Sequence, residues 1–286
     1  MTSAVKRAPA LVDAVWLAAN LARTDVKVLD ATFILPGIDR DARAEFAERH
    51  IPGAQFFDID TIADHAVSLP HMAPPPDDFA AAMGQLGIST GDHVICYDSH
   101  GLMSAARPWW MFRLYGHHQV SVLDGGLPAW IDQGGALEAG TPTAVPGTFT
   151  ASFDPSLVAT IDQVATSLEA GTATVLDARA QARFEGNAPE PRAGVLAGHM
   201  PGALSLPYTR LLDPATSQML KPDALAALLA DADVEDGPVT TSCGSGVTAC
   251  VLALGLAQIG RWDVSVYDGS WSEWGASDRP IITGAG

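Results

Sequence analysis

Short apolar runs alternate with amphipathic stretches along most of the chain. The runs at 27–31 (KVLDA), 93–98 (HVICYD) and 121–124 (SVLD) are apolar on both sides, which is typical of strands in a sheet covered on both faces. Between such runs lie stretches with a proline near the start, acids in the first turn and helical apolar spacing, as at 76–87 and 222–232. The alternation predicts a parallel α/β sheet.

Four segments of the first half recur in the second half in the same order. Each copy follows its partner by 144 to 149 residues, so the spacing barely changes. Chance similarity would not keep four segments in register, and we infer an internal duplication. The paired segments begin at Val28 and Val175, Arg49 and Gly198, His93 and Pro238, and Val120 and Val264.

The duplication predicts two α/β domains, each a mainly parallel β-sheet flanked by α-helices on both faces. We place these domains at residues 1–140 and 158–286. The stretch between them, 141–157, contains three prolines among small polar residues and is interpreted as a linker.

The composition excludes several classes of function. The 286 residues include 33 acidic and 16 basic side chains, and a net charge of -17 argues against nucleic acid as a partner. No apolar run is long enough to predict a membrane span. Three cysteines without a CxxC motif predict neither a disulfide framework nor a zinc site. We therefore expect a cytoplasmic protein that needs no metal or other cofactor.

Cys243 stands where a strand is predicted to end and a helix, 247–260, to begin. In parallel sheets, functional sites form beyond the carboxyl ends of the strands. Gly244 and Gly246 let the loop curl so that backbone N–H groups point inward, and the following helix adds partial positive charge. Such surroundings favour a thiolate, the nucleophilic form of cysteine. We predict that Cys243 is a catalytic nucleophile.

The matching turn of the first half, DSHG at 98–101, has Asp98 at the position of Cys243. A carboxylate cannot perform the chemistry of a thiolate in an anion-binding loop. The first half is therefore predicted to be a catalytically inactive copy, and the second half to be the catalytic one.

The other cysteines and two repeated histidines are interpreted as structural. Cys96 lies within a predicted strand and Cys250 within an apolar helix, where unpaired cysteines usually act as small buried residues. His50 and His199 occupy matching places in HIPGA and HMPGA. Because the inactive copy keeps its histidine, we assign both to the turn that follows.

Three motifs together carry a resemblance to a known family. The segments CGSGVTA at 243–249, RFEGNAPEPRAGVLAGHMPGA at 183–203 and ERHIPGAQFFDID at 48–60 resemble the tandem-rhodanese sulfurtransferases, in particular the branch that uses 3-mercaptopyruvate. The resemblance runs from about residue 26 to 274 and implies two rhodanese domains, with catalysis in the second. It also implies that the donor is bound by Arg183 and Arg192 and by the loop residues Gly244, Gly246, Val247 and Thr248.

The residues after Cys243 bear on the sulfur donor. Ala249 stands where the Cys–x5–Arg phosphatases have arginine, which argues against a phosphatase. Thiosulfate-preferring relatives carry basic residues directly after the cysteine, whereas Gly244 and Ser245 are neutral. Arginines outside the loop suit the carboxylate and keto group of 3-mercaptopyruvate. We expect that donor, a persulfide on Cys243 and release of pyruvate, with a thiosulfate:cyanide sulfurtransferase as the alternative.

The resemblance further implies a Ser–His–Asp relay of Ser245, His71 and Asp60, in which the histidine moves a proton near neutral pH. The sulfur acceptor is expected to be a thiol such as thioredoxin or a small dithiol, or cyanide. A non-catalytic persulfide carrier is the alternative from a different class. Arg183 and Arg192 argue against it, because a pure carrier need not recognise a small keto acid.

Overall fold

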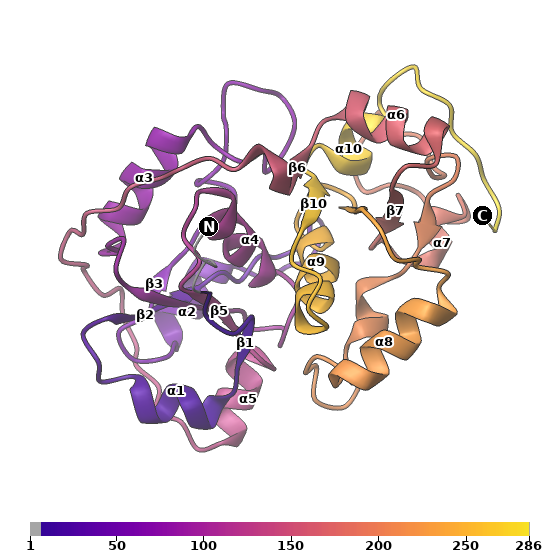
Figure 1. Ribbon diagram of the computed structural model, residues 1–286. Helices are drawn as coiled ribbons and strands as arrows, with labels where there is room; N and C mark the ends of the chain where they lie inside the picture. The colour runs from indigo at the N-terminus through magenta and orange to yellow at the C-terminus, as the bar shows by residue number, and fades with distance from the viewer. Residues whose placement is uncertain (1–6, 286) are drawn as a thin grey trace, which may run out of the picture. The chain divides into compact units, whose positions relative to one another are not determined.

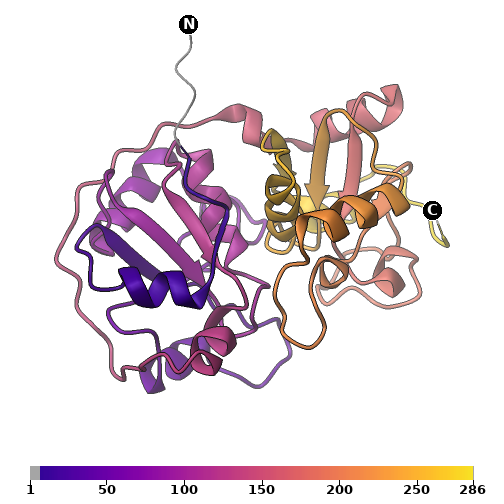
Figure 2. The same ribbon diagram turned by 60° about the horizontal axis from the view of Figure 1, so that its bottom comes forward.

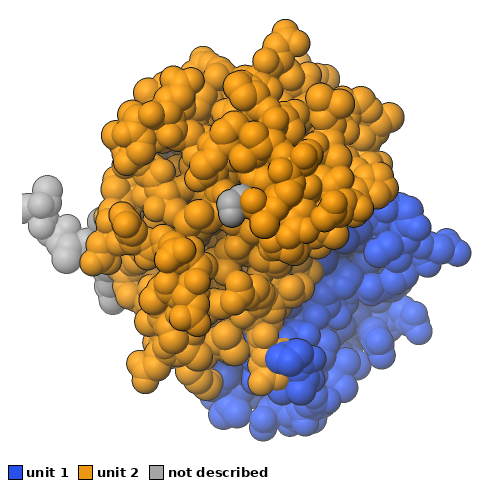
Figure 3. Space-filling model, turned by 90° about the vertical axis from the view of Figure 1, so that its right-hand side faces the viewer, with its two compact units in different colours: residues 1–62, 74–154, 214–218 blue, residues 63–73, 155–213, 219–286 orange. Residues whose placement is uncertain are grey.

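The computed structural model describes residues 7–285, and these fold into two compact units. The first unit comprises the residues up to 62 together with 74–154 and 214–218, and the second comprises 63–73, 155–213 and 219 onward (Figure 3). Two short segments are exceptions to a division of the chain at 141–157. Residues 63–73 precede this stretch but belong to the second unit, and residues 214–218 follow it but belong to the first unit. The predicted boundaries describe the duplication in sequence, and the compact units follow the packing of the chain.

The first unit is built on a five-stranded, wholly parallel sheet with strand order β1-β5-β4-β2-β3 (Figures 1 and 2). Its strands are β1 Leu11–Val12, β2 Val26–Asp30, β3 Gln55–Phe56, β4 His93–Tyr97 and β5 Val120–Leu123. Its helices are α1 Ala14–Asn20, α2 Ala42–Glu48, α3 Pro76–Gln85, α4 Ala106–Leu114 and α5 Gly126–Asp132.

Both faces of this sheet are covered, as the apolar strands predict. Ile95 and Tyr97 of β4 join a buried cluster with residues of α1, α2 and α5. Val94 and Cys96 alternate with them and face the other side of the sheet, and both are fully buried. On that side α4 packs against β4 and β5.

The second unit repeats the topology of the first with strand order β6-β10-β9-β7-β8, again all parallel. Its strands are β6 Val158–Ala159, β7 Thr174–Asp177, β8 Leu204–Ser205, β9 Val239–Ser242 and β10 Val264–Tyr267. Its α-helices are α6 Ile161–Ala170, α7 Gln181–Phe184, α8 Pro222–Asp231, α9 Ala249–Gln258 and α10 Ser270–Trp274, with short 3-10 helices η1 Pro155–Leu157 and η2 Tyr208–Leu211. The predicted fold class and the duplication are confirmed.

No helix within residues 7–285 is long and apolar enough to cross a membrane. The most apolar helix, α9, buries every residue except Gln258, which is why its sequence shows no polar face.

The two repeated histidines have matching structural contacts. The Nδ1–H group of His199 donates to the carbonyl oxygen of Phe184 at 2.8 Å, and the two rings stack with centroids 3.7 Å apart. His50 makes the same pair of contacts with Phe46, at 2.8 Å and 4.2 Å. Each histidine therefore joins the end of a short helix to the turn that follows it.

Replacing His199→Ala should lower the free energy of unfolding by about 3 kcal/mol, because it removes a fully buried ring and its hydrogen bond. Denaturant unfolding followed by circular dichroism measures this loss. The exposed His65→Ala is the matched control and should change stability by less than about 0.5 kcal/mol. Equal stability of the two variants would contradict the structural role of His199.

Candidate active site

The candidate nucleophile lies at the carboxyl edge of the second sheet. Strand β9 ends at Ser242 and α9 begins at Ala249, so the loop 243–248 connects the two as predicted. Cys243 is 2% exposed, and Gly246 has a φ of 78°, in the left-handed region that lets the loop turn back. The backbone N–H groups of Cys243 and Gly246 both donate to the hydroxyl oxygen of Ser270, each at 3.1 Å.

The remaining N–H groups of the loop form an open cradle. Those of Gly244, Ser245, Val247, Thr248 and Ala249 have no hydrogen-bond acceptor among the described residues. Consecutive unpaired N–H groups at the start of a helix are a binding site for negative charge. The cradle suits the thiolate or persulfide of Cys243 and the anionic groups that react with it.

The first unit shows the same loop with its cradle filled. The carboxylate of Asp98 accepts hydrogen bonds of 2.8–2.9 Å from four backbone N–H groups and is fully buried. The donors are His100, Met103, Ser104 and Ala105. Three of these four match the unpaired N–H groups of Ser245, Thr248 and Ala249 in the second unit. The loop therefore binds anions, and in the first unit its own carboxylate occupies it.

Ser245 and His71 meet within the second unit. The Nδ1 atom of His71 lies 3.0 Å from the hydroxyl oxygen of Ser245, and both residues are buried. His71 has a φ of 61°, a left-handed conformation uncommon for a residue with a side chain. The backbone N–H of Ala73 donates to the carboxylate of Asp268 at 2.7 Å, which ties the segment 63–73 to the end of β10.

Asp60, the third predicted member of the relay, belongs to the first unit. There its backbone N–H donates to the carboxylate of Asp58 at 3.0 Å, in the turn that follows β3. Ser245 and His71 therefore lie together, and the participation of Asp60 stays a prediction.

Arg183 lies directly beside the loop. A Cβ atom added at Gly244 would stand 3.1 Å from Nη2 of Arg183, so the guanidinium rests against the glycine. Glu190 accepts hydrogen bonds from both Nε and Nη2 of Arg183 and holds it there. The side chain of Arg183 keeps a quarter of its surface exposed and remains accessible to a ligand.

Arg192 reaches the loop through a serine. Its Nη1 lies 3.5 Å from the hydroxyl of Ser272, which itself donates to the carbonyl oxygen of Gly244 at 2.6 Å. Both predicted donor-binding arginines are therefore grouped around Gly244. Val247 and Thr248 complete the loop through their unpaired N–H groups.

A buried ionic network that the sequence did not predict supports Arg183. Arg179 pairs with Asp177 at 2.7 Å and with Glu190 at 2.8 Å, and its guanidinium lies over the ring of Trp271 at 4.2 Å. Burial disfavours the charge on Arg179, but attraction to the two carboxylates outweighs it and raises the pKa of the guanidinium. Arg179 follows VLDA at the position where the first copy has Thr32. This difference between the copies is the feature of the sequence that could have indicated a role for Arg179.

Ser270 was also missed, although the duplication points to it. It occupies the position of Gly126, and both have left-handed φ angles, 51° and 55°. The residue after each donates its N–H to the same loop, from Trp271 to Cys243 and from Leu127 to Asp98. A side chain at this strained position, where the copy has glycine, marks a functional hydroxyl.

The remaining cysteines have the expected structural places. Cys250 is fully buried, and its thiol donates to the carbonyl oxygen of Gly246 at 3.2 Å. Cys96 is fully buried in β4, and burial raises the pKa of its thiol far above the ordinary range. Neither arrangement provides an activated nucleophile.

Replacing Asp98→Ala should lower the free energy of unfolding by about 3 kcal/mol or more, because four buried N–H groups lose their acceptor. Denaturant unfolding measures the loss. Ser99→Ala, at the neighbouring half-buried residue of the turn, is the control and should cost less, because it removes only a hydrogen bond from Arg40. A stability equal to that of the parent protein would contradict the view that the carboxylate fills an anion-binding loop.

Comparisons with known proteins show which family the chain resembles. The model of the rhodanese-like domain matches the chain twice, at residues 13–133 and 160–277. The 3-mercaptopyruvate sulfurtransferase of Rattus norvegicus is 45% identical, over 95% of this chain and 93% of its own length. The thiosulfate sulfurtransferase of Cricetulus griseus is 40% identical, over 93% and 91%.

A solved structure extends the comparison to three dimensions. The crystal structure of a 3-mercaptopyruvate sulfotransferase from Escherichia coli superposes with a TM-score of 0.84 at 40% identity, covering 92% of this chain and 99% of its own. The chain therefore belongs to the rhodanese-like family, of which it contains two domains in tandem.

Proposed function

We propose that this protein is a 3-mercaptopyruvate sulfurtransferase that carries sulfur as a persulfide on Cys243. One observation carries the proposal: the loop of the second unit holds a cysteine in an open anion cradle, whereas Asp98 fills the same cradle in the first unit. Similarity to full-length 3-mercaptopyruvate sulfurtransferases supports the same activity. Catalysis is thus assigned to residues 158–286, and 1–140 is assigned as the inactive copy.

The donor is positioned by charge. Its carboxylate and keto oxygen are matched by the guanidinium groups of Arg183 and Arg192, which lie outside the loop and leave the cradle N–H groups to the sulfur. Glu190 and Arg179 fix the direction of Arg183, so little side-chain freedom is lost on binding.

The first step forms a sulfur–sulfur bond and breaks a carbon–sulfur bond. The thiolate of Cys243 attacks the sulfur of 3-mercaptopyruvate, and the electron pair of the carbon–sulfur bond passes to the donor as the enolate of pyruvate. Protonation of the enolate at carbon gives pyruvate, and a persulfide remains on Cys243. The cradle N–H groups stabilise the negative charge of the persulfide.

Ser245 and His71 are assigned to proton handling. Their side chains lie within hydrogen-bond distance, so the hydroxyl can pass a proton to the product side and recover one through the imidazole. Asp60 is proposed as the group that orients this histidine in the assembled enzyme.

The second step returns Cys243 to its starting state. A thiolate of a dithiol such as thioredoxin attacks the outer sulfur of the persulfide, and its second thiol then displaces hydrosulfide and forms a disulfide. Cyanide would take the same sulfur as thiocyanate. The free cysteines among the described residues suit a reducing compartment, and we propose the cytoplasm.

A second candidate, thiosulfate as the main donor, is favoured by the 40% identity to a thiosulfate sulfurtransferase. Gly244 and Ser245 argue against it, because neither adds positive charge for a compact dianion. The third candidate is a persulfide carrier without turnover of its own, and the assays below separate all three.

Replacing Cys243→Ser should abolish pyruvate and sulfide release from 3-mercaptopyruvate with a dithiol acceptor, because the hydroxyl cannot form a persulfide. Cys250→Ser is the matched control, since its hydroxyl can still donate to Gly246, and it should keep most of the activity. Full turnover by Cys243→Ser would overturn the mechanism. If intact protein gains the mass of one sulfur atom on Cys243 without releasing pyruvate catalytically, the carrier is the correct reading.

Replacing Arg183→Gln should lower kcat/KM for 3-mercaptopyruvate by about tenfold to a hundredfold, which corresponds to one charge-assisted hydrogen bond. Glu190 keeps Arg179 as its partner, so the fold should survive. The loss for thiosulfate should be smaller. An equal loss for both donors would mean that Arg183 acts on the loop rather than on the keto acid.

A further inference from the structure

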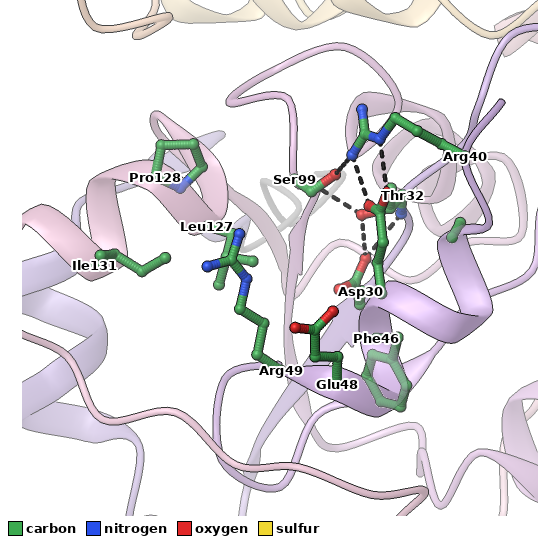
Figure 4. A pocket seen from close by; sticks show the side chains of 12 residues that line it. Asp30, Thr32, Arg40, Phe46, Glu48, Arg49, Ser99, Leu127, Pro128 and Ile131 are labelled. Atoms are coloured by element: carbon green, nitrogen blue, oxygen red, sulfur yellow. Dashed lines mark hydrogen bonds and ion pairs between the residues drawn. The ribbon is translucent and has the colours of Figure 1, made fainter. Parts of the chain in front are cut away.

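The first unit contains a cavity of about 430 Å³ at the carboxyl edge of its sheet, outside the loop that Asp98 fills. Figure 4 shows its two sides. Asp30, Thr32, Arg40 and Ser99 lie on one side, and Leu127, Pro128 and Ile131 of α5 lie on the other. Glu48, the last residue of α2, and Arg49, which follows it, project into the space between the two sides.

The cavity exists because two large residues of the second unit are small here. In the duplicated sequence Thr32 corresponds to Arg179, and Leu127 corresponds to Trp271. In the second unit the guanidinium of Arg179 lies over the ring of Trp271 at 4.2 Å, and both side chains are buried. The first unit has the same strand topology, but its smaller side chains, Thr32 and Leu127, leave this space open.

The charge of the cavity also differs from that of the donor site. Phe46 and Phe184 each stack on the repeated histidine of their own unit, so the residues before them occupy matching places. Those residues are Glu45 in the first unit and Arg183 in the second. A carboxylate therefore replaces the arginine that we assign to the keto acid, and the cavity does not suit a second molecule of an anionic donor.

Two opposite charges in the cavity remain available to a ligand. Arg40 is held by Glu45 at 2.6 Å and by the hydroxyl of Ser99 at 3.2 Å. In contrast, neither Glu48 nor Arg49 makes a side-chain hydrogen bond or a close ion pair with another described residue, and Arg49 acts on Glu45 only through its charge, which helps to lower the pKa of that carboxyl. Both are exposed to the cavity, with apolar side chains of α5 opposite them.

A buried carboxylate adds to the negative side. Asp30 is 2% exposed and accepts hydrogen bonds from the backbone N–H and the hydroxyl of Thr32. Burial raises the pKa of Asp30, and the negative charge of Asp98 adds to this effect, although hydrogen bonds from Thr32 and Tyr97 oppose it. A cationic group of a ligand beside Asp30 would stabilise the charged form of this carboxyl.

We propose that this cavity binds a small α-amino acid as a zwitterion. Its ammonium group lies against Glu48 and Asp30, its carboxylate pairs with Arg49, and its side chain packs on Leu127 and Ile131. The site is separate from the loop of Cys243, and no chemistry occurs in it.

Binding is tested on the full-length protein by saturation-transfer NMR with a mixture of the neutral L-amino acids, and then by calorimetry. L-leucine is the first probe, because the α5 side of the cavity is apolar. We expect a Kd on the order of 1 mM or below. The analogues 4-methylpentanoate, which lacks the ammonium group, and 3-methylbutylamine, which lacks the carboxylate, should each bind at least about tenfold more weakly.

Variants of the two available charges assign the contacts. Glu48→Gln should weaken the binding of L-leucine about tenfold and leave the weak binding of 4-methylpentanoate unchanged, because that analogue has no ammonium group. Arg49→Gln should also weaken the binding of L-leucine about tenfold and leave the weak binding of 3-methylbutylamine unchanged, because that analogue has no carboxylate. Leu127→Trp introduces the residue of the second unit, closes the cavity and should abolish binding. Arg23→Gln, an exposed residue of the same unit that pairs with Asp25, is the control.

Three results would overturn the proposal: no amino acid gives a signal that Leu127→Trp removes, both charge variants bind as the parent does, or the analogues bind as tightly as L-leucine. Turnover of 3-mercaptopyruvate is measured on the same preparations. A variant that loses amino-acid binding but keeps turnover, or loses turnover but keeps binding, would show that the two proposals stand or fall independently.

Discussion

The chemistry that we propose depends on a row of backbone N–H groups between β9 and α9 that have no acceptor among residues 7–285. Unpaired donors in a buried loop cost free energy, and the fold tolerates them because something negative is to be bound there. Two neighbouring serines hold the loop in the conformation that leaves these N–H groups open. Ser270 accepts hydrogen bonds from the N–H groups of Cys243 and Gly246, and Ser272 donates to the carbonyl oxygen of Gly244. In the mechanism that we propose, the arginines then supply selectivity from outside the loop.

Much of this arrangement could be predicted from the sequence, because it rests on local patterns. Alternation of strand and helix patterns gave the parallel sheets, and the repeated segments gave the duplication. Cys243 was identified by its place between a strand and a helix, and Asp98 by its place in the matching turn. These features need only short stretches of chain and a rule that parallel strands present their carboxyl ends at one edge.

The parts that could not be predicted depend on contacts between distant segments. The pairing of Glu190 with both Arg179 and Arg183 is decided by how the loop 185–195 folds back, which no periodicity encodes. The same holds for the segment 63–73, which sequence order assigns to the first half and packing assigns to the second unit. His71 was expected near Ser245 only through family resemblance, and the structure brings the two side chains together.

The carboxylate of Asp98 has an evolutionary consequence. After a gene duplication, the spare copy of a catalytic loop is a liability, because it retains the cost of open donors without the benefit of turnover. An acid at the nucleophile position removes the nucleophile and also provides an acceptor for the open N–H groups of the loop. Selection for a stable fold would then oppose its reversal, so the division of labour that we propose for the two halves would be hard to undo.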